Sequence, residues 1–211
     1  MTSSWPTLAG RAVVLEPLAV DHVDALVSAA NADRTTFGLT LVPDSHETML
    51  AYVTGLLADR DAGRAVPFVQ RDTRDGAVVG CTRFMDIRYW YGRRDDAGSA
   101  VPDEVEIGGT WLTPSAQRTA VNTEAKLMLL RHAFEVWQVQ RVAVCTDERN
   151  LQSRRAIERI GAAFEGILRS HRPSTASGEG GTLRNTAVYS IVRSEWPAVE
   201  TALVARLGYR G

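Results

Sequence analysis

The sequence predicts an α/β fold, counted as α+β in some classifications, in which one mixed sheet is flanked by helices. Residues 104–166 carry this prediction, because they read as an alternating strand, a polar turn, a long apolar-striped helix, a β-branched strand and a second helix. Further strands and helices precede and follow this β-α-β-α unit, with no linker, repeat or low-complexity tract in the sequence. The 211 residues, 45% hydrophobic and 23% charged, suit one sizeable core. We therefore predict a single domain over residues 1–211.

The segments before residue 104 predict a strand, two helices and two more strands. Residues 11–18 form a β-rich run, and Asp21 can cap a helix that follows it. Ser45 opens a second helix, which ends near Gly63. Two antiparallel strands, 65–71 and 77–88, then flank a polar turn with hairpin chemistry. Residues 89–102 form a long irregular connection, and ordered loops of this length are often functional.

From residue 104 onward the elements alternate more regularly. The helix after the polar turn carries a buried stripe, and the next helix starts at Asn150 and stops at Gly161. A strand over 163–170, a Gly/Ser/Pro-rich loop over 171–184 and a strand over 186–192 follow, and Ser194 starts a terminal helix closed by Gly208. The residues of the predicted stripe are Leu127, Leu130, Phe134 and Trp137.

Composition excludes several classes of protein. The net charge of -1 and the pI near 6.4 provide no electrostatic footprint for nucleic acid. No apolar run approaches the length that spans a membrane, and no signal peptide is visible at the N-terminus. Cys81 and Cys145 both lie in apolar strand-like runs, which favours small buried side chains over a zinc site or a disulfide. We expect a reduced, cytoplasmic protein without a metal.

The polar turn at residues 117–122 is a candidate anion site. It precedes a long helix, and the free N–H groups of a helix start, with the helix dipole behind them, favour phosphate or pyrophosphate. The alternative is purely structural, because every helix has such an end and Thr119 or Asn122 can simply cap it.

This stretch resembles the GNAT acyltransferase superfamily, whose signature here is Gln/Arg-x-x-Gly-x-Gly/Ala. Gln117 matches the first position, while Ala120 replaces the middle glycine and Asn122 the last small residue. The resemblance is closest to the Rim-type (ribosomal-protein N-terminal) acetyltransferase branch, through EIGGTWL, NTEAKLMLL and TDERNLQSRRAIERIGAAFEGILR. It covers most of residues 11–193 in element order and is specific from Glu104 to Arg169.

The resemblance implies a mostly antiparallel GNAT sheet and acetyl-CoA, or another acyl-CoA, as co-substrate. An alanine at position 120 costs about 1 kcal/mol if the family's glycine conformation is needed there, and nothing if its φ is helical. In this family a strand splays at a bulge so that pantetheine pairs with exposed backbone. The residues implied to bind the cofactor are Trp111, Leu112, Thr113, Gln117, Arg118, Thr119, Ala120, Val121, Asn122, Thr123, Asn150 and Ser153.

Glu106 is the candidate proton acceptor, because an ammonium group is not a nucleophile and must lose a proton before it attacks. It precedes the paired glycines Gly108 and Gly109, which suggest a bulge in the strand. The alternative is a solvent-facing glutamate. By resemblance Ser153 is a weaker candidate for donating a proton to the thiolate, while Asn150 is also a ready N-cap. His171 can substitute for a carboxylate that the Rim-type enzymes carry in this region.

The acceptor-binding residues implied by the fold are Arg83, Phe84, Trp90 and Tyr91. These residues are equally consistent with a homodimer contact or with variable surface. The leading function is acetyl transfer by direct attack of a primary amine, either a protein N-terminus or a small molecule. The alternatives are a catalytically idle CoA-binding module and, disfavoured by the charge, a nucleic-acid-associated domain. Acceptor loops vary freely on one scaffold, so the sequence does not name the acceptor.

Overall fold

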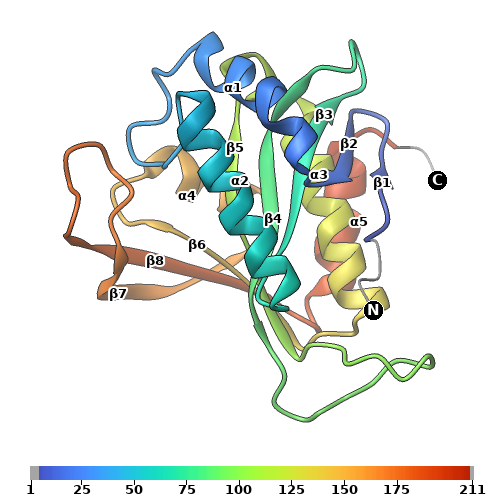
Figure 1. Ribbon diagram of the computed structural model, residues 1–211. Helices are drawn as coiled ribbons and strands as arrows, with labels where there is room; N and C mark the ends of the chain where they lie inside the picture. The colour runs from blue at the N-terminus through green and yellow to red at the C-terminus, as the bar shows by residue number, and fades with distance from the viewer. Residues whose placement is uncertain (1–4, 210–211) are drawn as a thin grey trace. The chain divides into compact units, whose positions relative to one another are not determined.

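The computed structural model describes residues 5–209, which divide into two compact units (Figure 1). The first unit holds the chain up to Met85 together with Gly108–Ala125, and the second holds Asp86–Ile107 together with the chain from Lys126 onward. The strands are β1 (Leu8–Ala9), β2 (Val13–Pro17), β3 (Val66–Asp72), β4 (Val78–Arg88), β5 (Glu104–Leu112), β6 (Arg141–Asp147), β7 (Ala163–Pro173) and β8 (Leu183–Val192). The α-helices are α1 (Val23–Ala32), α2 (His46–Asp61), α3 (Ala120–Arg131), α4 (Leu151–Arg159) and α5 (Trp196–Arg206).

The strands form a mixed, mostly antiparallel sheet in the order β1-β2-β3-β4-β5-β6-β8-β7. The recorded pairings are antiparallel except that of β5 with β6, which is parallel and joins Glu104–Glu106 to Arg141–Ala143. This confirms the predicted fold class. The sequence order of elements is also as predicted, apart from the short additional strand β1.

In the first unit, α1 and α2 pack beside each other over the core (Figure 1). Ser45 caps α2 as predicted, since its Oγ accepts from the N–H of Thr48 at 3.2 Å. Asp21, by contrast, caps no helix. It lies inside a 3-10 turn, Val20–His22, in which Nδ1 of His22 accepts from the N–H of Ala19 at 3.1 Å. This bond closes the 3-10 turn that leads into α1, and α1 starts without a side-chain cap.

In the second unit, β7 and β8 form a longer hairpin than the sequence predicts (Figure 1). Their pairing shifts register between Phe164 and Gly166 and again between Leu168 and Arg172. At the second shift Ser170 has a φ of 44°, and its N–H donates to Oδ1 of Asn185 at 2.9 Å. The predicted loop over residues 171–184 is too long, because its Gly/Ser/Pro-rich composition hides the pairing of Arg172 with Arg184 and of Pro173 with Leu183.

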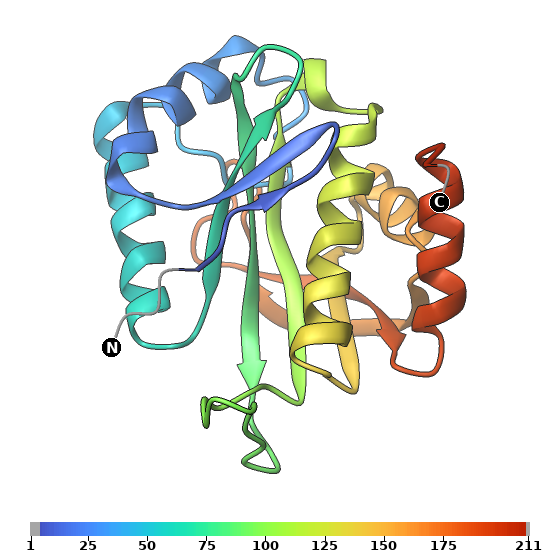
Figure 2. The same cartoon turned by 90° about the vertical axis from the view of Figure 1, so that its right-hand side faces the viewer.

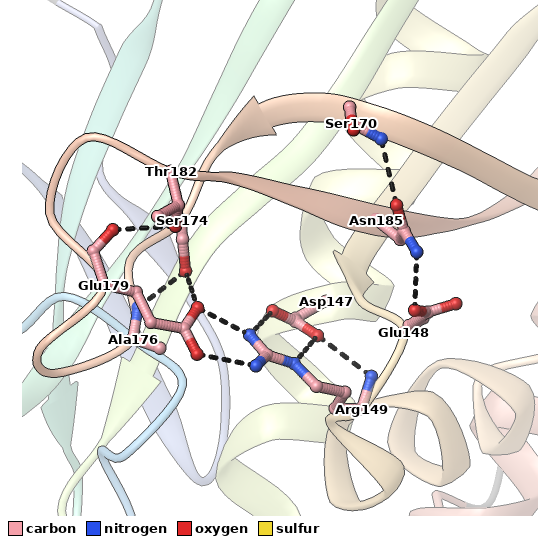
Figure 3. A network of polar contacts seen from close by, with 9 residues as sticks. All are labelled: Asp147, Glu148, Arg149, Ser170, Ser174, Ala176, Glu179, Thr182 and Asn185. Atoms are coloured by element: carbon pink, nitrogen blue, oxygen red, sulfur yellow. Dashed lines mark hydrogen bonds and ion pairs between the residues drawn. The ribbon is translucent and has the colours of Figure 1, made fainter.

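The connection between β7 and β8 is held by a charged network (Figure 3). Arg149 donates to both carboxylate oxygens of Glu179, at 2.7 and 2.9 Å, and also pairs with Asp147. Ser174 donates to Glu179 at 2.6 Å. The hydrogen bonds from Arg149 and Ser174 lower the pKa of Glu179 to about 2, so the network stays charged at neutral pH. The residues before β8 are therefore fixed to the end of β6.

The long apolar-striped helix is interrupted at its end. α3 stops at Arg131 and continues as one π-helical turn, His132–Val136, in which the N–H of Trp137 donates to the carbonyl of His132 at 3.0 Å. All four residues of the predicted stripe are buried, and the ring of Phe134 stacks on Trp196 of α5 at 5.2 Å. Among residues 5–209, no helix has the length and apolar character needed to cross a membrane.

Candidate active site

The start of α3 in the first unit carries the predicted anion site. Thr119 caps the helix, because its Oγ1 accepts from the N–H of Val121 at 3.2 Å and donates to the carbonyl of Ala116 at 2.7 Å. The capping expected of Thr119 or Asn122 is therefore provided by Thr119. The first turn of a helix has four N–H groups without intrahelical acceptors, and this cap satisfies one of them. The remainder of the turn, Ala120–Thr123, keeps the partial positive charge that attracts an anion.

The backbone conformation that favours glycine lies two residues before Ala120. Ala120 begins α3 and has no positive φ, whereas Arg118 has a φ of 58°. The alanine in the middle glycine position therefore carries no left-handed strain, and the exposed Arg118 carries it instead.

Replacing Arg118 with glycine is expected to raise the free energy of unfolding by about 1 kcal/mol, because glycine adopts a positive φ without the Cβ clash. Urea denaturation measures this change. The control R118A removes the same guanidinium but keeps a Cβ, so its stability should stay within about 0.5 kcal/mol of the natural protein. A glycine variant no more stable than R118A would contradict the assignment of strain to this residue.

Gln117 fixes the loop before α3 to the end of β5. Its Nε2 donates to the carbonyl of Leu112 at 3.0 Å and to Oγ1 of Thr36 at 2.9 Å. The N–H of Thr113 donates to the carbonyl of Val79 on β4 at 2.8 Å. The side chain of Gln117 thus organises the loop, and the N–H of Thr113 is already used within the sheet.

The last residues of β5 come very close to β4. A methyl group at Gly80 would lie 1.9 Å from the carbonyl oxygen of Trp111, so only glycine fits there. The side chains of Trp111 and Leu112 are buried. Any ligand that pairs with this end of β5 must therefore use its main chain, as predicted for pantetheine.

β5 runs unbroken through the paired glycines, but its backbone takes a left-handed conformation at the second of them. Gly109 has a φ of 56°, and the guanidinium of Arg83 lies so near that a Cβ on Gly109 would fall 2.3 Å from Nη1. The same Nη1 donates to the hydroxyl of Tyr52 at 3.3 Å. Of the two predicted acceptor residues on β4, Arg83 is half-buried beside Gly109, whereas Phe84 is fully buried against Phe68.

In the second unit, Glu106 lies in a buried ion-pair cluster. Its side chain is 5% exposed, which makes the alternative of a solvent-facing glutamate wrong. Arg172 of β7 donates from Nη1 to Oε1 at 3.0 Å and from Nη2 to Oε2 at 2.8 Å. Nη2 also donates to Oδ2 of Asp86 at 2.6 Å. Although burial opposes it, the hydrogen bonds and charges of the two carboxylates raise the pKa of Arg172, so the guanidinium stays charged.

Cys145 of β6 lies beside Glu106 but is a poor nucleophile. Burial, reinforced by the Glu106 carboxylate, raises the pKa of the Cys145 thiol to about 12. Burial raises the pKa of Cys81 to about 12 as well. Because only a thiolate attacks efficiently, both cysteines are inert at neutral pH.

Asn150 and Ser153 meet at the start of α4, as predicted for a helix cap. Oδ1 of Asn150 accepts from the N–H of Ser153 at 3.0 Å. This leaves the Asn150 amide nitrogen and the Ser153 hydroxyl for other partners, and Ser153 is half-buried. His171, the alternative base, is exposed on β7.

The loop between β4 and β5, at the bottom of the ribbon in Figure 2, carries exposed aromatic side chains on a fixed base. Trp90 and Tyr91 are 58% and 77% exposed, while their N–H groups both donate to Oδ2 of the buried Asp103, at 2.7 and 2.9 Å. Nε of Arg93 donates to Oδ1 at 2.7 Å. The hydrogen bond from Tyr91, with those from Arg93 and Trp90, lowers the pKa of Asp103. One carboxylate thus anchors both ends of the loop.

Replacing Asp103 with asparagine is expected to speed deuterium uptake at the amides of Trp90 and Tyr91, because the charge is lost and the amide nitrogen cannot accept both sets of bonds. Hydrogen exchange followed by mass spectrometry measures this. D96N, in the same loop but on an exposed side chain without a recorded contact, should leave uptake unchanged. Equal uptake in D103N and the natural protein would show that the anchor lies elsewhere.

Arg172 and Asp103 are site residues that the sequence does not predict. Each contacts residues distant in the chain: Arg172 is 66 positions from Glu106, and Asp103 is 13 positions from Trp90. The available signal is indirect. A buried glutamate needs a cation as its partner, and residues 170–172 include an arginine. The sequence does not show which of the many arginines is that partner.

Comparisons with known proteins identify the family and the fold. The profile of the Acetyltransferase (GNAT) domain family matches residues 12–163. A GCN5-related N-acetyltransferase from Brucella melitensis is 28% identical, with a TM-score of 0.80 over 96% of this chain and 85% of that one. A protein from T. thermophilus assigned as an acetyltransferase is 31% identical, with a TM-score of 0.78 over 98% and 100%. Mycobacterium smegmatis RimJ, solved with CoA-disulfide, shares the fold at 23% identity, with a TM-score of 0.73 over 92% and 88%. No functionally curated protein matches significantly.

Proposed function

The chain belongs to the GNAT acetyltransferase family and is an N-acetyltransferase. We propose that it transfers the acetyl group of acetyl-CoA to a primary amine, by direct attack of the amine on the thioester. The observation that carries the proposal is Glu106, a buried carboxylate two residues before the paired glycines of β5. It provides a base next to the point where the family's thioester reacts.

The start of α3 is proposed to bind the CoA pyrophosphate. The N–H groups of Ala120–Thr123 and the exposed Arg118 supply partial and full positive charge, while Gln117 and Thr119 shape the loop. The main chain of Trp111–Thr113, apart from the Thr113 N–H and the Leu112 carbonyl, which are already bonded, is proposed to pair with pantetheine. The side chains there are buried.

Glu106 is proposed to accept the proton of the attacking amine through a water molecule, because direct attack requires that this proton be removed. Arg172 occupies one hydrogen-bonding position on each carboxylate oxygen and keeps the carboxylate oriented. Each oxygen retains a second lone pair for water. An N–H near Gly108–Thr110 is proposed to polarise the thioester carbonyl.

Direct attack is favoured over a covalent acyl-enzyme by the state of the thiols. With pKa values of about 12, Cys81 and Cys145 both remain protonated at neutral pH.

In the second unit, Asn150 is proposed to bind pantetheine and Ser153 to donate a proton to the departing thiolate. The acceptor is a small-molecule amine or a protein N-terminus. For the first unit, Arg83 is proposed as an acceptor-binding residue, and the fully buried Phe84 supports its strand. For the second unit, Trp90 and Tyr91 are proposed as acceptor-binding residues.

Two measurements on the full chain test this function. Acetyl-CoA at 100 times its Kd should stabilise the protein by about 2.7 kcal/mol, which a thermal shift detects. Release of the CoA thiol should then depend on an added primary amine. No stabilisation by acetyl-CoA would exclude the assignment, and stabilisation without turnover across a broad amine panel would leave an idle CoA-binding module as the better description.

A further inference from the structure

Two arginines face each other across the β7–β8 hairpin. The antiparallel register pairs Arg172 of β7 directly with Arg184 of β8, and both side chains are half-buried. Like charges directly opposite each other in a sheet are unfavourable, so the arrangement needs compensating anions. For Arg172 these are Glu106 and Asp86.

Arg184, by contrast, has no anion bonded to it among residues 5–209. Within residues 5–209 its guanidinium makes no hydrogen bond or ion pair, and its buried Nε has no acceptor. Two carboxylates act on the charge of Arg184 without bonding to it, Asp147 and Glu106. Asp147 is paired with Arg149 at 2.7 Å, and Glu106 is paired with Arg172. Burial, together with repulsion from Arg172, lowers the pKa of Arg184. A buried donor without a partner is costly, and a guanidinium is the side chain best shaped to hold a carboxylate by two bonds.

The position of Arg184 relates it to the acceptor half of the reaction. Its charge interacts with Glu106, the proposed proton acceptor, and with Cys145 beside it. The residue that follows it, Asn185, bonds to Ser170 and Glu148, so this part of β8 is fixed (Figure 3). A rigid, unsatisfied guanidinium near the base is suited to orient a substrate.

We propose that Arg184 binds a carboxylate on the acceptor, so that the substrate is an amino-carboxylate whose amine is directed toward Glu106. This inference rests on the proposed function. A singly charged anion fits better than a phosphate dianion, because Glu106, Asp86 and Asp147 already lie around the two arginines. The carboxylate would pair with Arg184 and also screen its repulsion with Arg172.

The kinetic test compares α-amino acids with their carboxamides, which keep the amine but lack the carboxylate. R184Q is expected to lower the ratio of kcat/KM for acid over amide by about 10- to 100-fold, chiefly through KM, because a hydrogen-bonded charge pair is lost. Turnover of the amides and the Kd of acetyl-CoA should not change. R184K should recover part of the ratio, and R169Q, which removes an exposed arginine of β7, should behave as the natural protein. An unchanged ratio in R184Q would overturn the proposal.

A binding test keeps this inference separate from the proposed function. Titration calorimetry with N-acetylglycine and its neutral amide, in the presence of CoA, needs no turnover. The natural protein should bind the acid about tenfold more tightly than the amide, and R184Q should bind the two equally. Equal affinities in the natural protein would refute carboxylate binding even if amines are acetylated. Failure of acetyl-CoA to stabilise the chain would instead remove the proposed function.

Discussion

E106Q is expected to lower kcat/KM for the acceptor amine by about 100-fold, with the largest loss below the pKa of that amine. In this range the acceptor arrives as an ammonium ion and must lose its proton before it attacks the thioester. Glutamine fits the space and keeps an acceptor for Arg172, but it cannot take up the proton. The rate of thiol release, measured from about pH 6 to about pH 10 with saturating acetyl-CoA, provides the test.

A matched control lies two residues earlier on the same strand. Glu104 also pairs with an arginine, Arg141, at 3.2 Å, so E104Q removes an arginine-bound carboxylate from β5 without touching the proposed base. E104Q should keep the natural pH profile, and both variants should keep the Kd of acetyl-CoA. If the ratio of E106Q to natural rates were the same at every pH, Glu106 would be a partner that positions Arg172 and not the proton acceptor.

The fold can be predicted where local pattern and tertiary structure agree. The β-α-β-α unit is readable because its strands alternate or are uniformly apolar and its helices have a stripe and a cap, as at Asn150. The predicted β7–β8 hairpin is too short, because the register shifts near Gly166 and Ser170 remove the period on which a strand prediction depends. The predicted cap at Asp21 is wrong because a 3-10 turn, Val20–His22, includes this residue and leads directly into α1.

The site can be predicted only in its local parts. Thr119 and Asn150 are caps whose partners lie within three residues, and Glu106 is selected by its place on one strand. The partner of Glu106 depends on how β7 is positioned by pairing with β8, which no local pattern encodes. Arg184 lies in a predicted loop because its place in β8 likewise depends on pairing with β7.

Glu124 provides the largest expected effect on stability. This residue in the second turn of α3 is 2% exposed, and its carboxylate accepts three backbone N–H bonds from Arg11, Ala12 and Val13, which lead into β2. Oε1 accepts from Arg11 at 2.7 Å, and Oε2 accepts from Ala12 at 2.5 Å and from Val13 at 3.0 Å. The contact is tight, because a Cβ on Gly10 would lie 2.4 Å from the carboxylate carbon. One side chain therefore ties the beginning of the first unit to the helix proposed to bind pyrophosphate.

E124A is expected to lower the free energy of unfolding by about 3–6 kcal/mol, because each of three donors loses its acceptor at about 1–3 kcal/mol apiece, partly offset by water. The free energy of unfolding of E124Q should lie between those of E124A and the natural protein. Its amide oxygen still accepts hydrogen bonds, but its amide nitrogen faces N–H groups for which it provides no acceptor. Urea denaturation measures the stability of both variants, and E47A is the control. Glu47 is a glutamate near the start of α2 whose side chain is exposed, so its loss should lower the free energy of unfolding by at most about 0.5 kcal/mol. If E124A were no less stable than E47A, water would be replacing the carboxylate, and the position of the α3 start would depend on Thr119 and Gln117 alone.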